Sequence, residues 1–337
     1  MRQIGLDVGC AWVKAAQRDR SGRIERVAAF PRTNAGAGVD AQEAVLFAES
    51  LLRHGFEPSP IIIGMNARDV RLEEVDAPPV SDEHALDRII LGEIGRLSHW
   101  EPDTYTAQWW RVPSPTRASV QDTFFSIAAP ISTVDSSIEP LTAAGFDVQA
   151  VDLRVGAAAR LCAARAESDR LVIVVDVGWS CVEIAAYLDQ RLVFVRRLEG
   201  AGLASIDESL PRLRLGDRLL AESLALGRGA RSPAWDIART SFAAGARRIG
   251  ENLVAEINLT LTYLARRFPS AQRCDVLVAG GGARIDELIE PLATSPDVGA
   301  RRAEPGQLVG FCARAASQAS EPIFVSACGL AMWREER

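Results

Sequence analysis

Two short motifs of the same form, Asp-Val-Gly, have the residue types needed to bind a phosphorylated ligand. Asp7-Val8-Gly9 and Asp176-Val177-Gly178 each end an apolar run that is typical of a strand. Glycine lets backbone N–H groups approach phosphate oxygens closely. A carboxylate at a strand end can hold hydrated Mg²⁺, which keeps several of its waters. These motifs predict a phosphate site, with Asp7 and Asp176 as ligands of Mg²⁺ through water.

A lysine and a glycine triplet add to this prediction. Lys14 follows Asp7 by seven positions and is the sole lysine among 38 basic residues, and its ammonium could lie over the same phosphates. The segment Ala279-Gly280-Gly281-Gly282-Ala283 joins a predicted strand to a predicted helix, where glycines admit a flat ligand or a phosphate. A plain β-hairpin and a junction without a ligand are the alternatives. The repeated motif and the triplet together favour phosphate binding.

The elements that would position these residues form a duplicated pattern. Each Asp-Val-Gly motif ends a first strand, a second strand follows the turn, and a third strand follows a second turn. The first unit has strands at 4–8, from 13 and at 24–30, and the second has strands at 171–177, 181–188 and 191–198. The repetition predicts an internal duplication of architecture.

Between the two units, the chain predicts a separate strand–helix–strand insert over about residues 70–112. Leu86, Ile90, Ile94 and Leu97 recur at helical spacing after Ser81, and strands flank this helix. The pair Trp109-Trp110 in the second strand is either an aromatic anchor for a partner peptide or the packing of a small sheet.

Composition excludes several classes of function. The net charge of −6 and the scattered arginines argue against a nucleic-acid-binding protein, which needs a concentrated basic face. No apolar run approaches the ~18–20 residues that span a bilayer, and no signal-peptide pattern opens the chain. The six cysteines form no CxxC motif and the three histidines share no metal-ligand spacing. We therefore expect a protein of the cytosol.

In their order and spacing, these motifs resemble the PilM family of actin-like pilus-assembly proteins, within the actin, Hsp70 and sugar-kinase superfamily. The resemblance covers nearly the whole chain. It rests first on two phosphate hairpins (residues 4–15 and 174–178) and on the glycine triplet as an adenosine motif (279–283). It also rests on the start of an insert (75–83), the return to the first domain (143–153), an Ala-Glu pair (221–222) and a terminal helix (328–331).

The resemblance implies an α/β, duplicated actin-like (ribonuclease H-like) fold, with two domains around a nucleotide cleft. The first domain would comprise residues 1–166 and 310–337 with a small α+β subdomain inserted at about 35–125, and the second would comprise 167–309. ATP and Mg²⁺ are the implied cofactors. The implied binding residues are Asp7, Gly9, Lys14, Asp176, Gly178, Ser180, Glu222, Gly280, Gly281 and Gly282.

The chain departs from the family pattern inside this site. Cys10, Ala11 and Trp12 stand where the family usually has small hydroxyl residues, and Ala225 stands where it tends to have a lysine. Glu183 adds a carboxylate after the second turn, where it would repel a phosphate if it pointed inward. The sequence therefore predicts a fold built to hold ATP, with weak or absent hydrolysis.

The implied function is that of a scaffold at the inner face of the inner membrane. Its expected partners are the cytoplasmic N-terminal peptide of a PilN-like membrane protein, bound near the 70–112 insert, and the motor or platform proteins of a pilus. A homo-oligomer is compatible with the sequence, no nucleic acid is expected, and membrane contact would come through the partner.

Two other functions stay open at this stage. A sugar or acid kinase of the same superfamily would need a carboxylate base in the cleft. A filament-forming protein of the FtsA type would need an amphipathic membrane helix, which we do not expect after Trp333–Arg337.

Overall fold

Two five-stranded sheets of identical topology form the centre of the protein. The computed structural model describes residues 2–113, 121–167, 169–208, 233–271 and 273–334. In each sheet an antiparallel three-stranded unit is followed by two parallel strands. The strand order of the first sheet is β3 (Ile24–Pro31), β2 (Trp12–Arg18), β1 (Gln3–Val8), β4 (Ile61–Met65) and β8 (Val148–Leu153). The strand order of the second sheet is β11 (Arg191–Glu199), β10 (Cys181–Leu188), β9 (Arg170–Val177), β12 (Arg273–Ala279) and β13 (Arg301–Arg302). The predicted duplication is confirmed.

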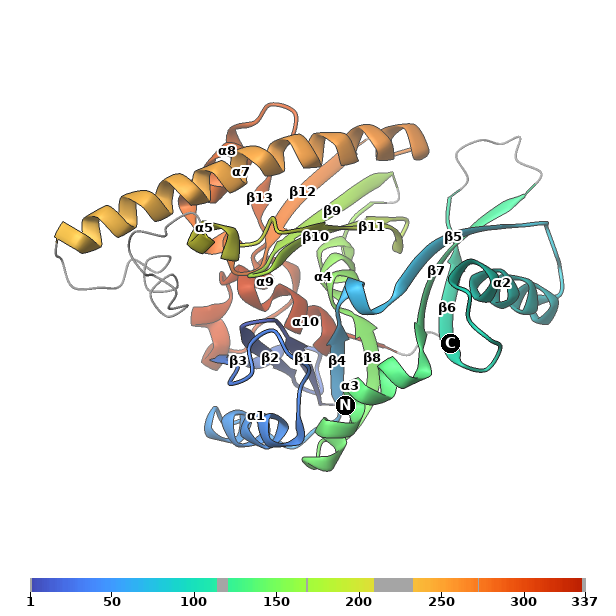
Figure 1. The fold of residues 1–337 in the computed structure, drawn as a ribbon, viewed down its shortest axis with the longest axis horizontal. Coiled ribbons are helices and arrows are strands. Elements are labelled where there is room, and N and C mark those ends of the chain that lie inside the picture. Colours follow the sequence, from blue (N-terminus) through green and yellow to red (C-terminus); the bar gives the residue numbers. More distant parts are fainter. Residues whose placement is uncertain (1, 114–120, 168, 209–232, 272, 335–337) are drawn as a thin grey trace.

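Two helices lie between the sheets, where the two halves meet (Figure 1). The helix α10 (Val325–Ala331) packs on β1, β2 and β4, whereas α4 (Arg154–Ala163) packs on β9 and β10. The two helices touch at Gly329, where a Cβ atom would lie 2.2 Å from the carbonyl oxygen of Ala157. Because α4 packs on the second sheet, the predicted domain boundary at residue 166 lies after a helix that belongs to the second core.

The remaining long helices cover the outer faces of the sheets. In the first half, α1 (Ala41–Arg53) and α3 (Ile131–Ala143) cover the sheet, and in the second half α7 (Pro233–Arg267) and α8 (Asp286–Thr294) do so. The helix α7 buries an apolar stripe against the sheet, with Leu253 and Ile257 in the core. Shorter elements are α5 (Ala204–Glu208), α9 (Pro305–Leu308), η1 (Ala67–Asp69), η2 (Gly282–Arg284), η3 (Ala313–Gln318) and η4 (Pro322–Phe324).

The insert is a three-stranded sheet with one helix, on the right in Figure 1. Its strands have the order β5 (Arg71–Ala77), β7 (Asp122–Pro130), β6 (Tyr105–Arg111), and its helix is α2 (Glu83–Ser98). The predicted start of the insert at about residue 35 is wrong. The strand β4 pairs with β1, and Phe47 of α1 lies in the first core, so both belong to the first half.

The tryptophan pair serves the packing of this insert. The ring of Trp109 meets Phe124 edge to face at 5.4 Å, and its Nε1–H donates to Asp87 at 2.9 Å. The Nε1–H of Trp110 donates to the carbonyl oxygen of Leu192 on β11 at 2.7 Å. The two tryptophans therefore pack within the small sheet and bind it to the second half. Of the two alternatives for this pair, the structure supports packing of the sheet.

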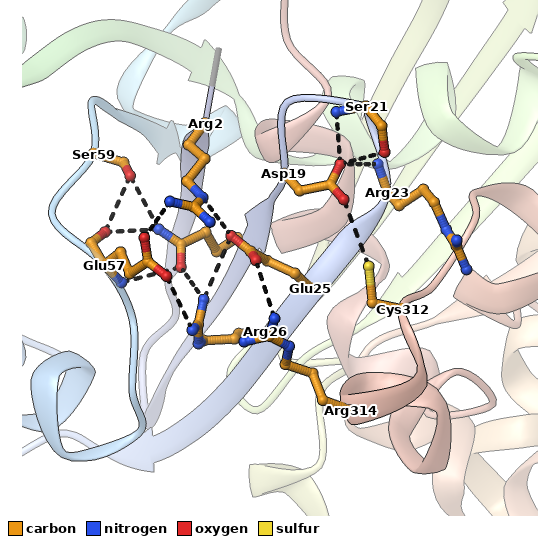
Figure 2. A network of polar contacts seen from close by, with 11 residues as sticks. Arg2, Asp19, Ser21, Arg23, Glu25, Arg26, Glu57, Ser59, Cys312 and Arg314 are labelled. Carbon is orange, nitrogen blue, oxygen red and sulfur yellow. Dashed lines mark hydrogen bonds and ion pairs between the residues drawn. The ribbon is translucent and has the colours of Figure 1, made fainter.

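A polar network fastens the C-terminal segment to the first half (Figure 2). The buried carboxylate of Glu25 lies 3.0 Å from Arg2 and 3.9 Å from Arg314. The thiol of Cys312 lies 3.6 Å from Asp19, and the backbone of Ile24 bonds to that of residues 310 and 312 at 2.8 Å. These contacts place residues 310–314 along the edge of β3.

Candidate functional site

A cleft of about 420 Å³ lies at the carboxyl ends of the central strands and is lined by both halves. Eight of the ten predicted binding residues line it: Asp7, Gly9, Lys14, Asp176, Gly178, Ser180, Gly280 and Gly281. Gly282 does not line the cleft but packs behind its lining residues, where a Cβ atom would be 2.3 Å from the side chain of Val177. Glu222 and the departure at Ala225 lie outside the described residues. Cys10, Ala11 and Trp12 also line the cleft.

The two Asp-Val-Gly motifs form turns of the same geometry. The N–H of Gly9 donates to the carbonyl of Trp12 at 2.9 Å, and that of Gly178 donates to the carbonyl of Cys181 at 3.0 Å. The strand register then places Asp7 opposite Lys14 and Asp176 opposite Glu183. Glu183 is therefore the positional counterpart of Lys14.

In the first hairpin, Asp7 is held by two cations. Its Oδ2 atom lies 3.0 Å from the Nζ atom of Lys14, and its Oδ1 atom lies 3.7 Å from Nη1 of Arg154. The carboxylate is buried, and Oδ1 has no hydrogen-bond partner among the described residues. The charge of Asp7 is thus balanced inside the protein.

In the second hairpin, Arg154 supplies the positive charge. It begins α4, and its Nη2 atom donates to Glu183 at 2.6 Å. The other oxygen of Glu183 accepts the backbone N–H of Ala67 at 3.1 Å. Burial disfavours the charge of Arg154, but the charges of Glu183, Asp176 and Asp7 outweigh it and raise the pKa of Arg154 well above its usual value. The guanidinium stays charged at the floor of the cleft.

Asp176 lies beside this guanidinium and against the glycine triplet. Burial raises the pKa of Asp176, while Arg154 opposes the rise and the charges of Asp7 and Glu183 add to it. Gly280 has φ of +83°, and a Cβ atom there would lie 2.1 Å from Oδ1 of Asp176. Only glycine fits this position, so the triplet and the second hairpin form one wall.

A buried ion pair supports the first turn from behind. Nη2 of Arg32 lies 2.6 Å from Glu43 of α1, and its Nη1 atom donates to the carbonyl of Gly9 at 3.3 Å. Glu43 also accepts the backbone N–H groups of Thr33 and Asn34. Burial alone would raise the pKa of Glu43, but the bonds from Arg32 and these N–H groups lower it overall. The pair fixes the turn on which Asp7 is presented.

Sequence reasoning missed Arg32, Glu43 and Arg154. For Arg154 a signal exists, because it directly follows the parallel strand β8 and opens a helix that is otherwise small and apolar except for Arg160. The strands β1, β4 and β8 are parallel, so a residue just after β8 lies at the same sheet edge as Asp7. Arg32 and Glu43 pair only through the tertiary fold, and no local spacing marks them.

The residues present do not fit a hydrated Mg²⁺ held by Asp7 and Asp176. Both oxygens of Asp7 already face cations, and the guanidinium of Arg154 lies where a divalent ion would meet it with like charge. Within the described part of the chain, no group of three metal-binding side chains has the geometry to hold a metal ion.

Comparison with known proteins bears on the fold. No protein-family model and no curated protein matches the chain. Among solved structures, it is similar to the PilM–PilN type IV pilus biogenesis complex, with 19% identity over 98% of this chain and 97% of that one and a TM-score of 0.75. A ROK family glucokinase from Streptomyces griseus in complex with glucose and AMPPNP shares 13% identity, with 98% of each chain covered and a TM-score of 0.52. MreB 5 of Spiroplasma citri bound to AMPPNP shares 11% identity over 97% and 94%, with a TM-score of 0.50.

The chain therefore has the actin-like fold, and the predicted fold class is confirmed. The predicted resemblance to PilM is confirmed at the level of the fold, over almost the full length of both chains. In the described residues, the structure has no helix of the length and apolarity needed to cross a bilayer.

Proposed function

We propose that this protein is an actin-like scaffold of a type IV pilus or related assembly platform, at the inner face of the inner membrane. It binds ATP in the cleft and the cytoplasmic N-terminal peptide of a PilN-like membrane protein on its surface. The observation that supports this proposal is the likeness over the whole chain to PilM from a PilM–PilN complex, with a TM-score of 0.75 against 0.52 and 0.50 for the kinase and MreB 5.

The surface proposed for the peptide is the end of α7 that adjoins the insert. Arg267 of α7 lies 3.2 Å from Glu74 of β5, and Tyr263 packs on Phe194 of β11 with ring centroids 5.5 Å apart. Tyr263 is 45% exposed, and Leu259, one helical turn earlier on the same face, is 62% exposed. An apolar pair in this position offers an anchor to a short peptide beside the insert.

The cleft favours ligand binding over phosphoryl transfer to a second substrate. A kinase of this superfamily needs a carboxylate free to accept the proton of the substrate hydroxyl. Asp7 lies 3.0 Å from the half-buried Lys14, and Glu183 lies 2.6 Å from the buried Arg154. These two carboxylates are not free to act as a base, which leaves Asp69 and Asp176 as the other carboxylates that line the cleft.

A peptide titration tests this function. Calorimetry of the full chain with the N-terminal cytoplasmic peptide of a PilN-like membrane protein should show saturable binding. Leu259→Ser should weaken binding by about tenfold, because an apolar anchor is lost. Leu52→Ser on α1, where the leucine is 61% exposed, is the matched control and should leave the affinity unchanged. Absence of binding to the wild-type chain contradicts the proposal, and equal losses in both variants contradict the location.

A further inference from the structure

More basic than acidic side chains line the cleft. Six basic residues line it against three acidic ones. The basic residues are Lys14, Arg32, Arg68, Arg154, Arg197 and Arg284, and the acidic residues are Asp7, Asp69 and Asp176. Each of the six basic side chains also lies within 4 Å of a carboxylate, so a polyanion in this cleft would share these cations with the protein's own carboxylates.

One of these cations lies at the junction of both halves. The guanidinium of Arg154 is 2.6 Å from Glu183 of the second hairpin and 3.7 Å from Asp7 of the first. Its side chain is 9% exposed, and its Nε atom has no partner among the described residues. A buried charge of this kind persists only with its counter-charges, and here the two hairpins supply them.

We propose that Arg154 takes the place of a divalent cation in this cleft, so that the cleft binds its nucleoside polyphosphate as the metal-free anion. The inference rests on the proposed nucleotide site and specifies the form of its ligand. The phosphate groups would then contact Lys14 and the lining arginines, which keep their ion pairs with the protein's carboxylates, in place of Mg²⁺. A divalent ion would have to enter beside a fixed guanidinium and displace it from Asp7 and Glu183, at the expense of two buried charge pairs.

Nucleotide titrations with and without metal test the ligand form. A fluorescent ATP analogue is titrated into the full chain in EDTA and in excess Mg²⁺. The dissociation constant in EDTA should be equal to or lower than that in Mg²⁺, because the protein supplies the cations. Binding that is about tenfold or more tighter with Mg²⁺ overturns the proposal.

Binding of Mn²⁺ to the protein alone tests the role of Arg154 independently of nucleotide. Electron paramagnetic resonance should find no bound Mn²⁺ in the wild-type chain and a bound ion in Arg154→Gln, where Asp7, Asp176 and Glu183 lose their shared cation. Arg160→Gln is the matched control, since Arg160 lies on the same helix and pairs with Asp152 at 2.6 Å. A wild-type Mn²⁺ site that Asp7→Asn abolishes overturns the proposal, as does a folded Arg154→Gln variant that binds none.

The two measurements separate this inference from the proposed function. If the wild-type chain binds no nucleotide in either buffer, the proposed ATP site is contradicted and the Mn²⁺ result decides the role of Arg154. If Arg154→Gln does not fold, the paired nucleotide titrations of the wild-type chain decide it. Tight binding only in Mg²⁺ leaves the ATP site standing and contradicts the metal-free form.

Discussion

On the first half of the molecule, Asp7 of β1 faces Lys14 of β2, and on the second half the equivalent residues are Asp176 of β9 and Glu183 of β10. The turns between the strands are closed by the same hydrogen bond in both halves. The backbone geometry of the duplication is thus kept, while the charge opposite the aspartate is reversed. A hairpin with two facing carboxylates needs a cation from outside it, and Arg154 of α4 provides one.

This difference makes one half depend on the other. Arg154 follows β8 of the first sheet, begins a helix that packs on the second sheet, and reaches carboxylates of both hairpins. The Asp7–Lys14 pair is complete within its own hairpin. Loss of Arg154 should therefore affect the cleft and the junction between the halves together.

The far ends of the two hairpins differ as well. Between β2 and β3, Asp19 accepts bonds from Ser21 and Arg23, and these bonds lower its pKa to about 2. Between β10 and β11, Asp189 and Gln190 have φ of +51° and +60°, and burial together with the charge of Asp169 raises the pKa of Asp189. The first turn is held by a charged side chain, and the second by backbone conformation.

Removing the cation of the second half should give the largest effect. Arg154→Gln leaves Glu183 and Asp176 buried without their counter-charge, and we expect a loss of about 3–5 kcal/mol in the free energy of unfolding. Arg160→Gln, on the same helix but a third exposed, should lose about 1 kcal/mol. Urea unfolding followed by circular dichroism measures both. Similar losses in the two variants would contradict the special role of Arg154.

Closing the approach between the glycine triplet and Asp176 should give an intermediate effect. Gly280→Ala forces a Cβ atom into a left-handed conformation and against Oδ1 of Asp176, and we expect a loss of about 2–4 kcal/mol. Gly281→Ala is the control, because Gly281 has helical dihedral angles and a Cβ there meets nothing closer than 3.9 Å. Its stability should stay within about 0.5 kcal/mol of the wild type. Thermal unfolding of both variants distinguishes this account from one in which the whole triplet is equally sensitive.

Neutralising the hairpin ends should give the smallest effect and a distinct pH dependence. Asp19→Asn removes a carboxylate whose folded pKa lies near 2, below its unfolded value of about 3.9, and should lose about 0.5 kcal/mol at pH 7 because the site is solvent-screened. The loss should fade as the pH falls from about 4 to about 2, where the wild-type carboxylate also becomes protonated. Asp189→Asn should lose nothing at pH 7, since the raised pKa of Asp189 marks an unfavourable charge. Equal losses in the two variants would contradict the difference between the turns.

Most of the fold could be predicted because its signals are local. Alternating apolar residues and turn glycines define each hairpin, and the repeat of Asp7-Val8-Gly9 at Asp176-Val177-Gly178 indicates the duplication. The extent of the insert could not be predicted, because α1 and β4 join the first core through pairing with β1, far away in sequence. The charge balance of the site was missed for the same reason: Arg154 and Glu183 are 29 positions apart and meet only in the fold.

A double-mutant cycle between residues 154 and 183 tests the central claim most directly. The free energy of unfolding is measured for the wild type, Arg154→Gln, Glu183→Gln and the double variant. We predict a coupling energy of at least about 2 kcal/mol, because each single change leaves the other buried charge without its nearest partner while the double change removes both charges. A coupling energy below about 0.5 kcal/mol, the range of independent sites, would contradict the claim that Arg154 is the cation of the second hairpin.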